Sequence, residues 1–226
     1  MRLFQSTIGL KILMALSGLV GVGFVVGHML GNLQIFLGAE ALNSYAATLH
    51  ANAPLLWGAR VVLLGAILVH VSTAIRLNRK ASGSRPIAYT GKGGWLGASY
   101  ATRTMRQGGY ILLAFIIYHL LHLTWGAPVL PAEYVADADW AAAGEKGVDV
   151  YKNVMNGFKF IPTALFYIVA QVMLGLHLTH GIHSMSRTIG ISNPVWTERA
   201  ASAAIGTGMV ITAGNVAVVL FGMIAG

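Results

Sequence analysis

The chain has 226 residues, of which 56% are hydrophobic and only 10% are charged. Soluble domains carry about 25% charged residues, so this composition excludes an ordinary soluble domain and indicates an integral membrane protein. The net charge of +8 does not indicate nucleic-acid binding, because the basic residues flank apolar segments and form no basic patch on a soluble fold.

Five apolar segments are long enough to cross a bilayer, which takes about 20 residues in a helix. The first follows Arg2 and Lys11 and continues through Leu33 without a clear cleavage site, so we expect a mature helix and not a signal peptide. The connection 126–157 is polar, and we expect short helical pieces in it. The fold class predicted is an all-α membrane protein, a five-transmembrane-helix bundle formed as one domain by residues 1–226. The predicted helices span about 9–33, 56–77, 108–125, 160–184 and 203–225.

The loop charges predict a cytoplasmic N-terminus and a C-terminus outside. In this orientation eleven of the fifteen basic residues lie inside and six of the seven acidic residues lie outside, in agreement with the positive-inside rule. The inside basic residues are Arg2, Lys11, Arg76, Arg79, Lys80, Arg85, Lys92, Arg103, Arg106, Arg187 and Arg199. The outside acidic residues are Glu40, Glu133, Asp137, Asp139, Glu145 and Asp149.

Histidines occur in each of the first four predicted helices, where ionisable side chains are costly and usually face the interior of the bundle. The fifth helix has none, and we expect His50 to be solvated in the first outer loop. The intramembrane histidines are His28 on the first helix, His70 on the second, His119 and His122 on the third, and His177, His180 and His183 on the fourth.

Depth sorts these histidines into two layers. His28 and His119 lie near the outer ends of their helices, whereas His70 and His177 lie about seven residues, or roughly 10 Å, before the inner ends of theirs. One pair on each side of the membrane is what two stacked bis-histidine haems would need, and neutral imidazole is a good axial ligand for haem iron. The absence of cysteine excludes a c-type haem, an iron–sulfur cluster held by thiolates and disulfide bonds.

Two other interpretations stay open at this point. A proton-coupled transporter also uses intramembrane histidines, but it predicts acidic residues within the helices, and the five apolar segments contain none. Ubiquinol-oxidising cytochromes b usually place two haem ligands on each of two helices, whereas the ligands predicted here come one per helix.

Glycines flank the predicted ligands and indicate either close helix contacts or room for a flat macrocycle. They are Gly23, Gly27, Gly31, Gly175 and Gly181.

Four regions in chain order carry a family resemblance. They are GHMLGNLQIFLGAEALNSY with His28, LVHVSTAIRLNRK with His70, RQGGYILLAFIIYHLLH, and LHLTHGIHSMSRTIGI. With these motifs the chain resembles, over nearly its whole length, the cytochrome b subunit of type B succinate:quinone oxidoreductases and fumarate reductases, in which one five-helix chain carries two haems. In that family the third ligand lies thirteen residues after the position of Arg106 and the fourth lies four residues before a glycine, here Gly181. The resemblance therefore selects His119 and His177.

The resemblance implies that His70 and His177 hold a proximal haem b, and that His28 and His119 hold a distal one. His122, His180 and His183 become candidates for propionate contacts or proton transfer, with ordinary polar contacts as the alternative. Arg76 and Arg187 could pair with propionates or extend to lipid headgroups. Ser17 and Asn32 are polar residues that could lie near a haem or a quinone.

The resemblance also implies partners. A flavoprotein subunit with FAD would oxidise succinate, an iron–sulfur subunit would relay the electrons, and this chain would anchor both at a bacterial cytoplasmic (inner) membrane. The basic loop from Arg76 to Arg106 could dock them, or could serve topology alone. The electron acceptor would be a quinone, with menaquinone suggested by the dihaem type.

One position departs from the pattern, because some dihaem fumarate reductases have a proton-conducting glutamate where this chain has Gly175.

Overall fold

The computed structural model describes residues 5–84, 99–125 and 149–225, which form helices and no strand. Five of these helices are long and apolar enough to cross a membrane, as the sequence predicts: α1 with its extension η2, α3, α4 with its extension η3, α7, and α8. The elements are α1 (Thr7–Asn32), η2 (Leu33–Leu37), α2 (Ala39–Ala51), α3 (Ala53–Gly83), α4 (Tyr100–His119), η3 (Leu120–Thr124), α6 (Val150–Lys159), α7 (Ile161–Thr188) and α8 (Pro194–Ala225).

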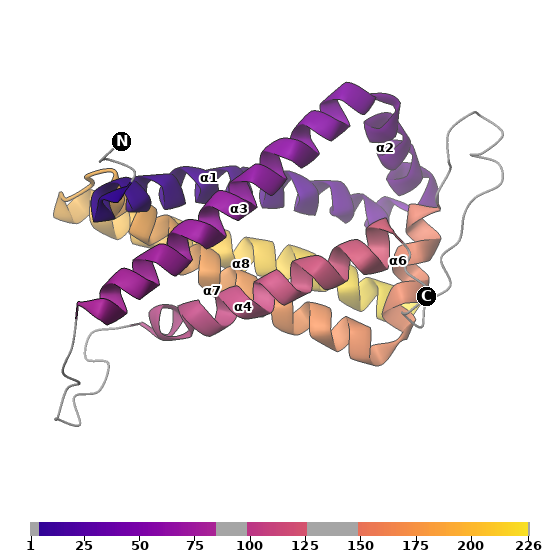
Figure 1. The fold of residues 1–226 in the computed structure, drawn as a ribbon. Helices are drawn as coiled ribbons and strands as arrows, with labels where there is room; N and C mark the ends of the chain where they lie inside the picture. The colour runs from indigo at the N-terminus through magenta and orange to yellow at the C-terminus, as the bar shows by residue number, and fades with distance from the viewer. Residues whose placement is uncertain (1–4, 85–98, 126–148, 226) are drawn as a thin grey trace.

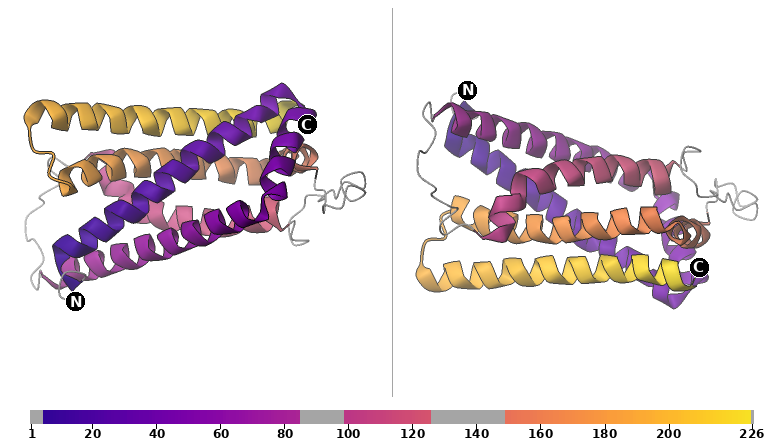
Figure 2. Two further views of the ribbon diagram at one scale, coloured as in Figure 1. Left: turned by 90° about the horizontal axis from the view of Figure 1, so that it is seen from above. Right: turned by 90° about the horizontal axis from the view of Figure 1, so that it is seen from below.

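The five long helices run lengthwise between the two ends of the bundle, so that α1 begins and α8 finishes at opposite ends (Figure 1). The short helices α2 and α6 lie together at the end where α8 finishes (Figure 1). Helix α1 packs along α3, α4 packs along α7, and α7 packs along α8. The views from above and below show α1 crossing the bundle diagonally (Figure 2). Which end faces the cytoplasm stays a prediction from the loop charges.

The surface of the bundle is apolar along the long helices. Large side chains such as Leu68, Met209 and Val210 are each more than 60% exposed. Such a surface would associate in water, whereas the tails of lipids are themselves apolar and accommodate it. The helical backbone also satisfies its own hydrogen bonds, as the interior of a bilayer requires. The exposed side chains therefore agree with a multi-pass membrane protein.

Most of the helices are longer than the apolar segments that predict them. Helix α4 begins at Tyr100 and not near 108, where Ser99 caps it by accepting a hydrogen bond from the Thr102 amide. Helix α8 begins at Pro194 and not near 203, and Asn193 accepts a hydrogen bond from the Val195 amide at its start. Hydropathy detects only the apolar stretch of a helix, and these polar first turns lie outside the apolar stretch.

Small residues bring α7 and α8 into close contact. Ala170 and Ala204 are fully buried, and a Cβ atom added to Gly175 would lie 3.0 Å from the carbonyl oxygen of Gly208. The Asn215 amide donates a hydrogen bond of 2.8 Å to the Gln171 side chain across the same interface. Close backbone approach with interhelical hydrogen bonds is how membrane helices associate without a hydrophobic driving force.

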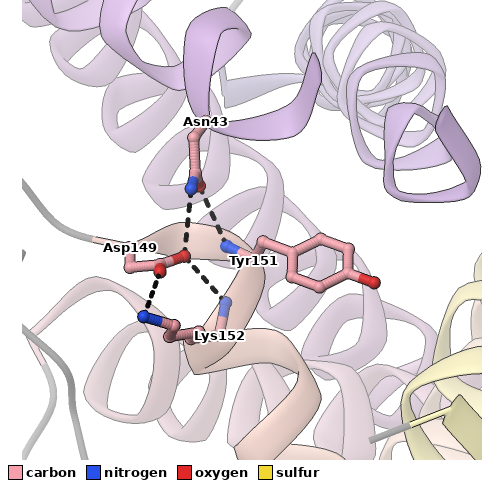
Figure 3. A network of polar contacts seen from close by, with 4 residues as sticks. All are labelled: Asn43, Asp149, Tyr151 and Lys152. Atoms are coloured by element: carbon pink, nitrogen blue, oxygen red, sulfur yellow. Dashed lines mark hydrogen bonds and ion pairs between the residues drawn. The ribbon is translucent and has the colours of Figure 1, made fainter. Parts of the chain in front are cut away.

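The two short helices are joined by a polar network at their end of the bundle (Figure 3). The Asn43 amide on α2 donates to the Asp149 carboxylate at 3.0 Å, and its oxygen accepts from the Tyr151 amide at 3.0 Å. Asp149 also caps α6 by accepting from the Lys152 amide. Helix α6 falls partly within the predicted connection of short helical pieces, whereas α2 was not predicted at all. Gly38 precedes α2 with a φ of 100°, a conformation that favours glycine.

Candidate functional site

The structure brings the four predicted ligands together as two pairs. The ring centroids of His28 on α1 and His119 on α4 are 5.7 Å apart, and the two rings are nearly perpendicular at 82°. The centroids of His70 on α3 and His177 on α7 are 6.0 Å apart, at an angle of 54°. Each pair therefore consists of imidazoles from two different membrane helices.

The two helices of each pair are not extensively packed on one another. Among the described residues, α1 packs on α3 and α4 packs on α7, but α1 and α4 make no extensive backbone contact, nor do α3 and α7. In each pair, the contact between the two helices is therefore made by the histidine rings themselves. Gly18 gives one ring room, since a Cβ atom there would lie 3.3 Å from Cε1 of His70.

The spacing within each pair fits two axial ligands on one metal ion. A first-row metal binds an imidazole nitrogen at about 2 Å, and that nitrogen lies about 1 Å from the ring centre, so two imidazoles on opposite sides of one ion have centroids about 6 Å apart. The observed separations of 5.7 and 6.0 Å agree with this value. Among the described residues no three histidine or carboxylate side chains gather around one point. Two protein ligands suffice for haem, because the macrocycle supplies the other four.

The two pairs lie at different depths. His70 contacts Ser17, and eleven residues further along α1 is His28, which corresponds to about 16 Å of helix. On α7, His177 lies ten residues after Tyr167, which contacts His119, and this corresponds to about 15 Å. Two independent helices therefore give the same separation between the two pairs. After their predicted depths, His70 and His177 are called the inner pair, and His28 and His119 the outer pair.

In the inner pair, His70 is held by the backbone of α1. Its Nδ1 lies 3.1 Å from the carbonyl oxygen of Met14 and 3.3 Å from the Ser17 hydroxyl, which itself donates to the Leu13 carbonyl at 2.7 Å. A carbonyl oxygen can only accept, so Nδ1 carries the hydrogen and Nε2 keeps its lone pair for a metal. Metal-binding histidines almost always donate their other N–H in this way.

His177, the other member of the inner pair, has a buried Nδ1 with no hydrogen-bond partner among the described residues. Buried polar atoms in native proteins nearly always have a partner, so this nitrogen indicates a partner group that the described residues do not supply. The Nε2 of His183, less than two turns further along α7, is buried in the same way.

In the outer pair, aromatic rings support both histidines. Phe24 stacks on His28 with centroids 5.3 Å apart, and Phe115 stacks on His119 at 5.6 Å. His119 Nδ1 also lies 3.2 Å from the hydroxyl of Tyr167 on α7. Tyr167 was not singled out by the sequence analysis, although it lies ten residues before His177 and hence at the predicted outer depth.

The remaining histidines have separate environments. His122 is buried, and its Nδ1 lies 3.0 Å from the Tyr167 hydroxyl. His180 Nδ1 lies 3.0 Å from the Thr102 hydroxyl on α4, which is an ordinary polar contact. His50 is exposed at the last turn of α2 and contacts the carbonyl of Ala46. The expectation of a solvated His50 agrees with this position.

The glycines beside the predicted ligands divide into two groups. Gly31 packs against Tyr45, and Gly175 packs against α8, so both serve close contacts between helices. Cβ atoms added to Gly23, Gly27 or Gly181 would meet nothing within 4 Å among the described residues.

Basic residues gather where α1 begins and α3 finishes. A cleft of about 270 Å³ there is lined by Gln5, Leu10, Arg76, Arg79 and Lys80, and Lys80 donates to the carbonyl of Gln5. Part of the predicted basic loop, including Arg85 and Lys92, lies outside the described residues, as do Arg2 and the acidic residues from Glu133 to Glu145.

Comparison with known proteins finds no match for this chain. No protein-family model matches the chain, and no curated protein or solved structure is significantly similar to it. The functional argument therefore depends on the residues and their arrangement.

Proposed function

We propose that this chain is the dihaem cytochrome b anchor of a succinate:quinone oxidoreductase or fumarate reductase. The observation that carries the proposal is the pairing of His28 with His119 and of His70 with His177, across four helices and at two depths. Each haem b, when bound, supplies a centre that takes up and releases one electron. The resemblance of the four histidine-containing regions to that family supports the same assignment.

The chain's own residues would hold and tune the two haems. His70 would bind iron through Nε2 while the Met14 carbonyl fixes its tautomer, and His177 would bind from α7. His28 and His119 would bind the outer haem between stacked phenylalanine rings. Burial in an apolar bundle, ligand type and hydrogen bonds to the ligands are the means by which a protein sets haem potential.

We propose that the soluble partners dock at the end where α1 begins and α3 finishes. Arg76, Arg79 and Lys80 make this end basic, and the positive-inside rule predicts that it faces the cytoplasm. The family resemblance implies that the membrane is the cytoplasmic membrane of a bacterium. The partners are a flavoprotein subunit with FAD and an iron–sulfur subunit, and the electron acceptor or donor in the membrane is a quinone, menaquinone by the family resemblance.

The absorption spectrum of the full chain, purified from membranes in detergent, tests this function. The expected result is a reduced-minus-oxidised difference spectrum with b-type bands and a haem content of about two per polypeptide. Co-purification of a succinate-oxidising flavoprotein from the native host tests the partners separately. A chain that folds in the membrane of a haem-replete host and contains no haem would refute the proposal.

A further inference from the structure

A single hydroxyl group lies between two histidines at the outer pair. The hydroxyl oxygen of Tyr167 is 3.2 Å from Nδ1 of His119 and 3.0 Å from Nδ1 of His122. Tyr167 is only 4% exposed, and its ring packs edge-on against Phe115 and Phe158. The hydroxyl is therefore held in place by α4, α6 and α7 together.

The chemistry of the three groups fixes the direction of both hydrogen bonds. If Nε2 of His119 binds iron, its neutral imidazole carries the hydrogen on Nδ1, which must then donate to the Tyr167 oxygen. Tyr167 has one hydrogen, and the remaining neighbour that can accept it is Nδ1 of His122. The result is a directed chain from His119 through Tyr167 to His122.

The local backbone favours this chain. His119 is the last residue of α4, and the next turn, η3, is a π-helical turn that contains His122. Such wider turns occur often at functional sites, and this one brings both histidines to the same hydroxyl. His122 has little freedom to move away, because a Cβ atom on Gly157 of α6 would lie 2.5 Å from its Nε2.

We propose that Tyr167 is a positioning residue for the outer haem, which fixes the tautomer of His119 and increases its electron donation to iron, with His122 as the acceptor that orients the tyrosine. This inference rests on the proposed function. An imidazole whose N–H is hydrogen-bonded is a more basic ligand and favours ferric iron. In the chain, the bond from Tyr167 to His122 strengthens the oxygen as an acceptor for His119.

Tyr167→Phe tests the proposal, because it keeps the ring contacts and removes both hydrogen bonds. The expected result in the purified full chain is a shift of the outer haem's midpoint potential to a more positive value, with a changed low-spin ferric signal in electron paramagnetic resonance. The inner haem should keep its wild-type potential and signal. Tyr118→Phe is the matched control, since Tyr118 donates or accepts one bond of 2.6 Å with Thr163 and none with a predicted ligand.

A second pair of variants keeps the test decisive if Tyr167→Phe does not fold. His122→Leu removes the acceptor and should shift the outer haem in the same direction by a smaller amount, whereas His122→Asn keeps an acceptor near Nδ1 and should restore the wild-type potential. An unchanged outer haem in Tyr167→Phe, or in His122→Leu when Tyr167→Phe does not fold, would overturn the proposal. Equal shifts of both haems would do the same. Absence of haem from the wild-type chain would instead refute the proposed function.

Discussion

Nδ1 of His70 on α3 lies 3.1 Å from the main-chain carbonyl oxygen of Met14 on α1. The acceptor belongs to the backbone of a neighbouring helix, so no single side-chain substitution on α1 removes it. The contact fixes the tautomer of His70 and the direction of its ring, which faces His177. The outer ligand His119 obtains the same kind of support from a side chain, Tyr167. One ligand of each pair is thus held by a different kind of acceptor, and the two pairs should respond to different substitutions.

Removing one ligand should remove one haem. His70→Leu and His177→Leu should each reduce the haem content from about two to about one per chain and abolish the same component of a redox titration. His28→Leu and His119→Leu should abolish the other component. The exposed His50 provides the control, since His50→Leu should keep both haems. Loss of the same component in His70→Leu and His28→Leu would contradict the pairing.

Gly18 should be required for the inner haem. A side chain at Gly18 would press on the His70 ring, from which even a Cβ atom is only 3.3 Å away. Gly18→Val should therefore displace the ring and change the spectrum of the inner haem while leaving the outer haem unaffected. Gly21→Val, three residues further along α1, is the matched control, because a Cβ atom there meets nothing within 4 Å. Identical inner-haem spectra in the two variants would show that Gly18 has no such role.

Hydropathy and histidine depth predict part of the candidate site. The number of membrane helices follows from hydropathy, and the pairing of histidines follows from alternating helix direction, because both depend on position along the chain. The contacts that hold the predicted ligands cannot be predicted in this way, because they depend on how the helices pack. The Met14 carbonyl is a backbone group that every residue possesses, and Gly18 differs in no visible way from Gly21 until α3 is placed beside it.

Helix α2 was missed for a related reason. Its sequence lies between two membrane segments and has no apolar stretch long enough to span a bilayer, so the topology rules treat it as a loop. Its place is fixed by tertiary contacts, above all by Asn43 with α6. The departure at Gly175 also gains an explanation in three dimensions, because this position faces Gly208 on α8 and has no room for a glutamate.

The contact between Gly175 and Gly208 should be essential for the packing of α7 on α8. Gly208→Leu would place its side chain against the Gly175 carbonyl, only 2.6 Å from a Cβ atom, and overpacking of this kind costs about 1–3 kcal/mol or more. The matched control is Gly206→Leu on the same helix, where a Cβ atom meets nothing within 4 Å. Thermal unfolding in detergent measures the difference. Equal melting temperatures for the two variants would mean that α8 does not pack on α7 through this face.

Asp149 should make the stability of the α2–α6 junction depend on pH. Burial opposes its ionisation, but hydrogen bonds from the Lys152 amide and the Asn43 side chain, with the Lys152 ammonium 3.3 Å away, together lower the pKa of Asp149 below its ordinary value. A carboxyl group whose pKa is lowered by folding stabilises the folded state above its unfolded pKa. This contribution is lost as the pH falls through the folded pKa.

Two substitutions separate the parts of this contribution. Asp149→Ala removes the helix cap and the Asn43 contact, so we expect a loss of about 1–2 kcal/mol at neutral pH. Lys152→Ala should change stability by less than about 0.5 kcal/mol, because the lysine side chain is 64% exposed and its ion pair is screened by solvent. Asp149→Asn keeps a capping oxygen but cannot ionise, so its stability deficit relative to the wild type should become smaller as the pH falls below about 4. Melting curves recorded between neutral pH and about pH 3 measure this, since the ordinary pKa of a carboxyl group lies near 4. A deficit that is constant over that range would show that the charge of Asp149 contributes nothing and that only its geometry matters.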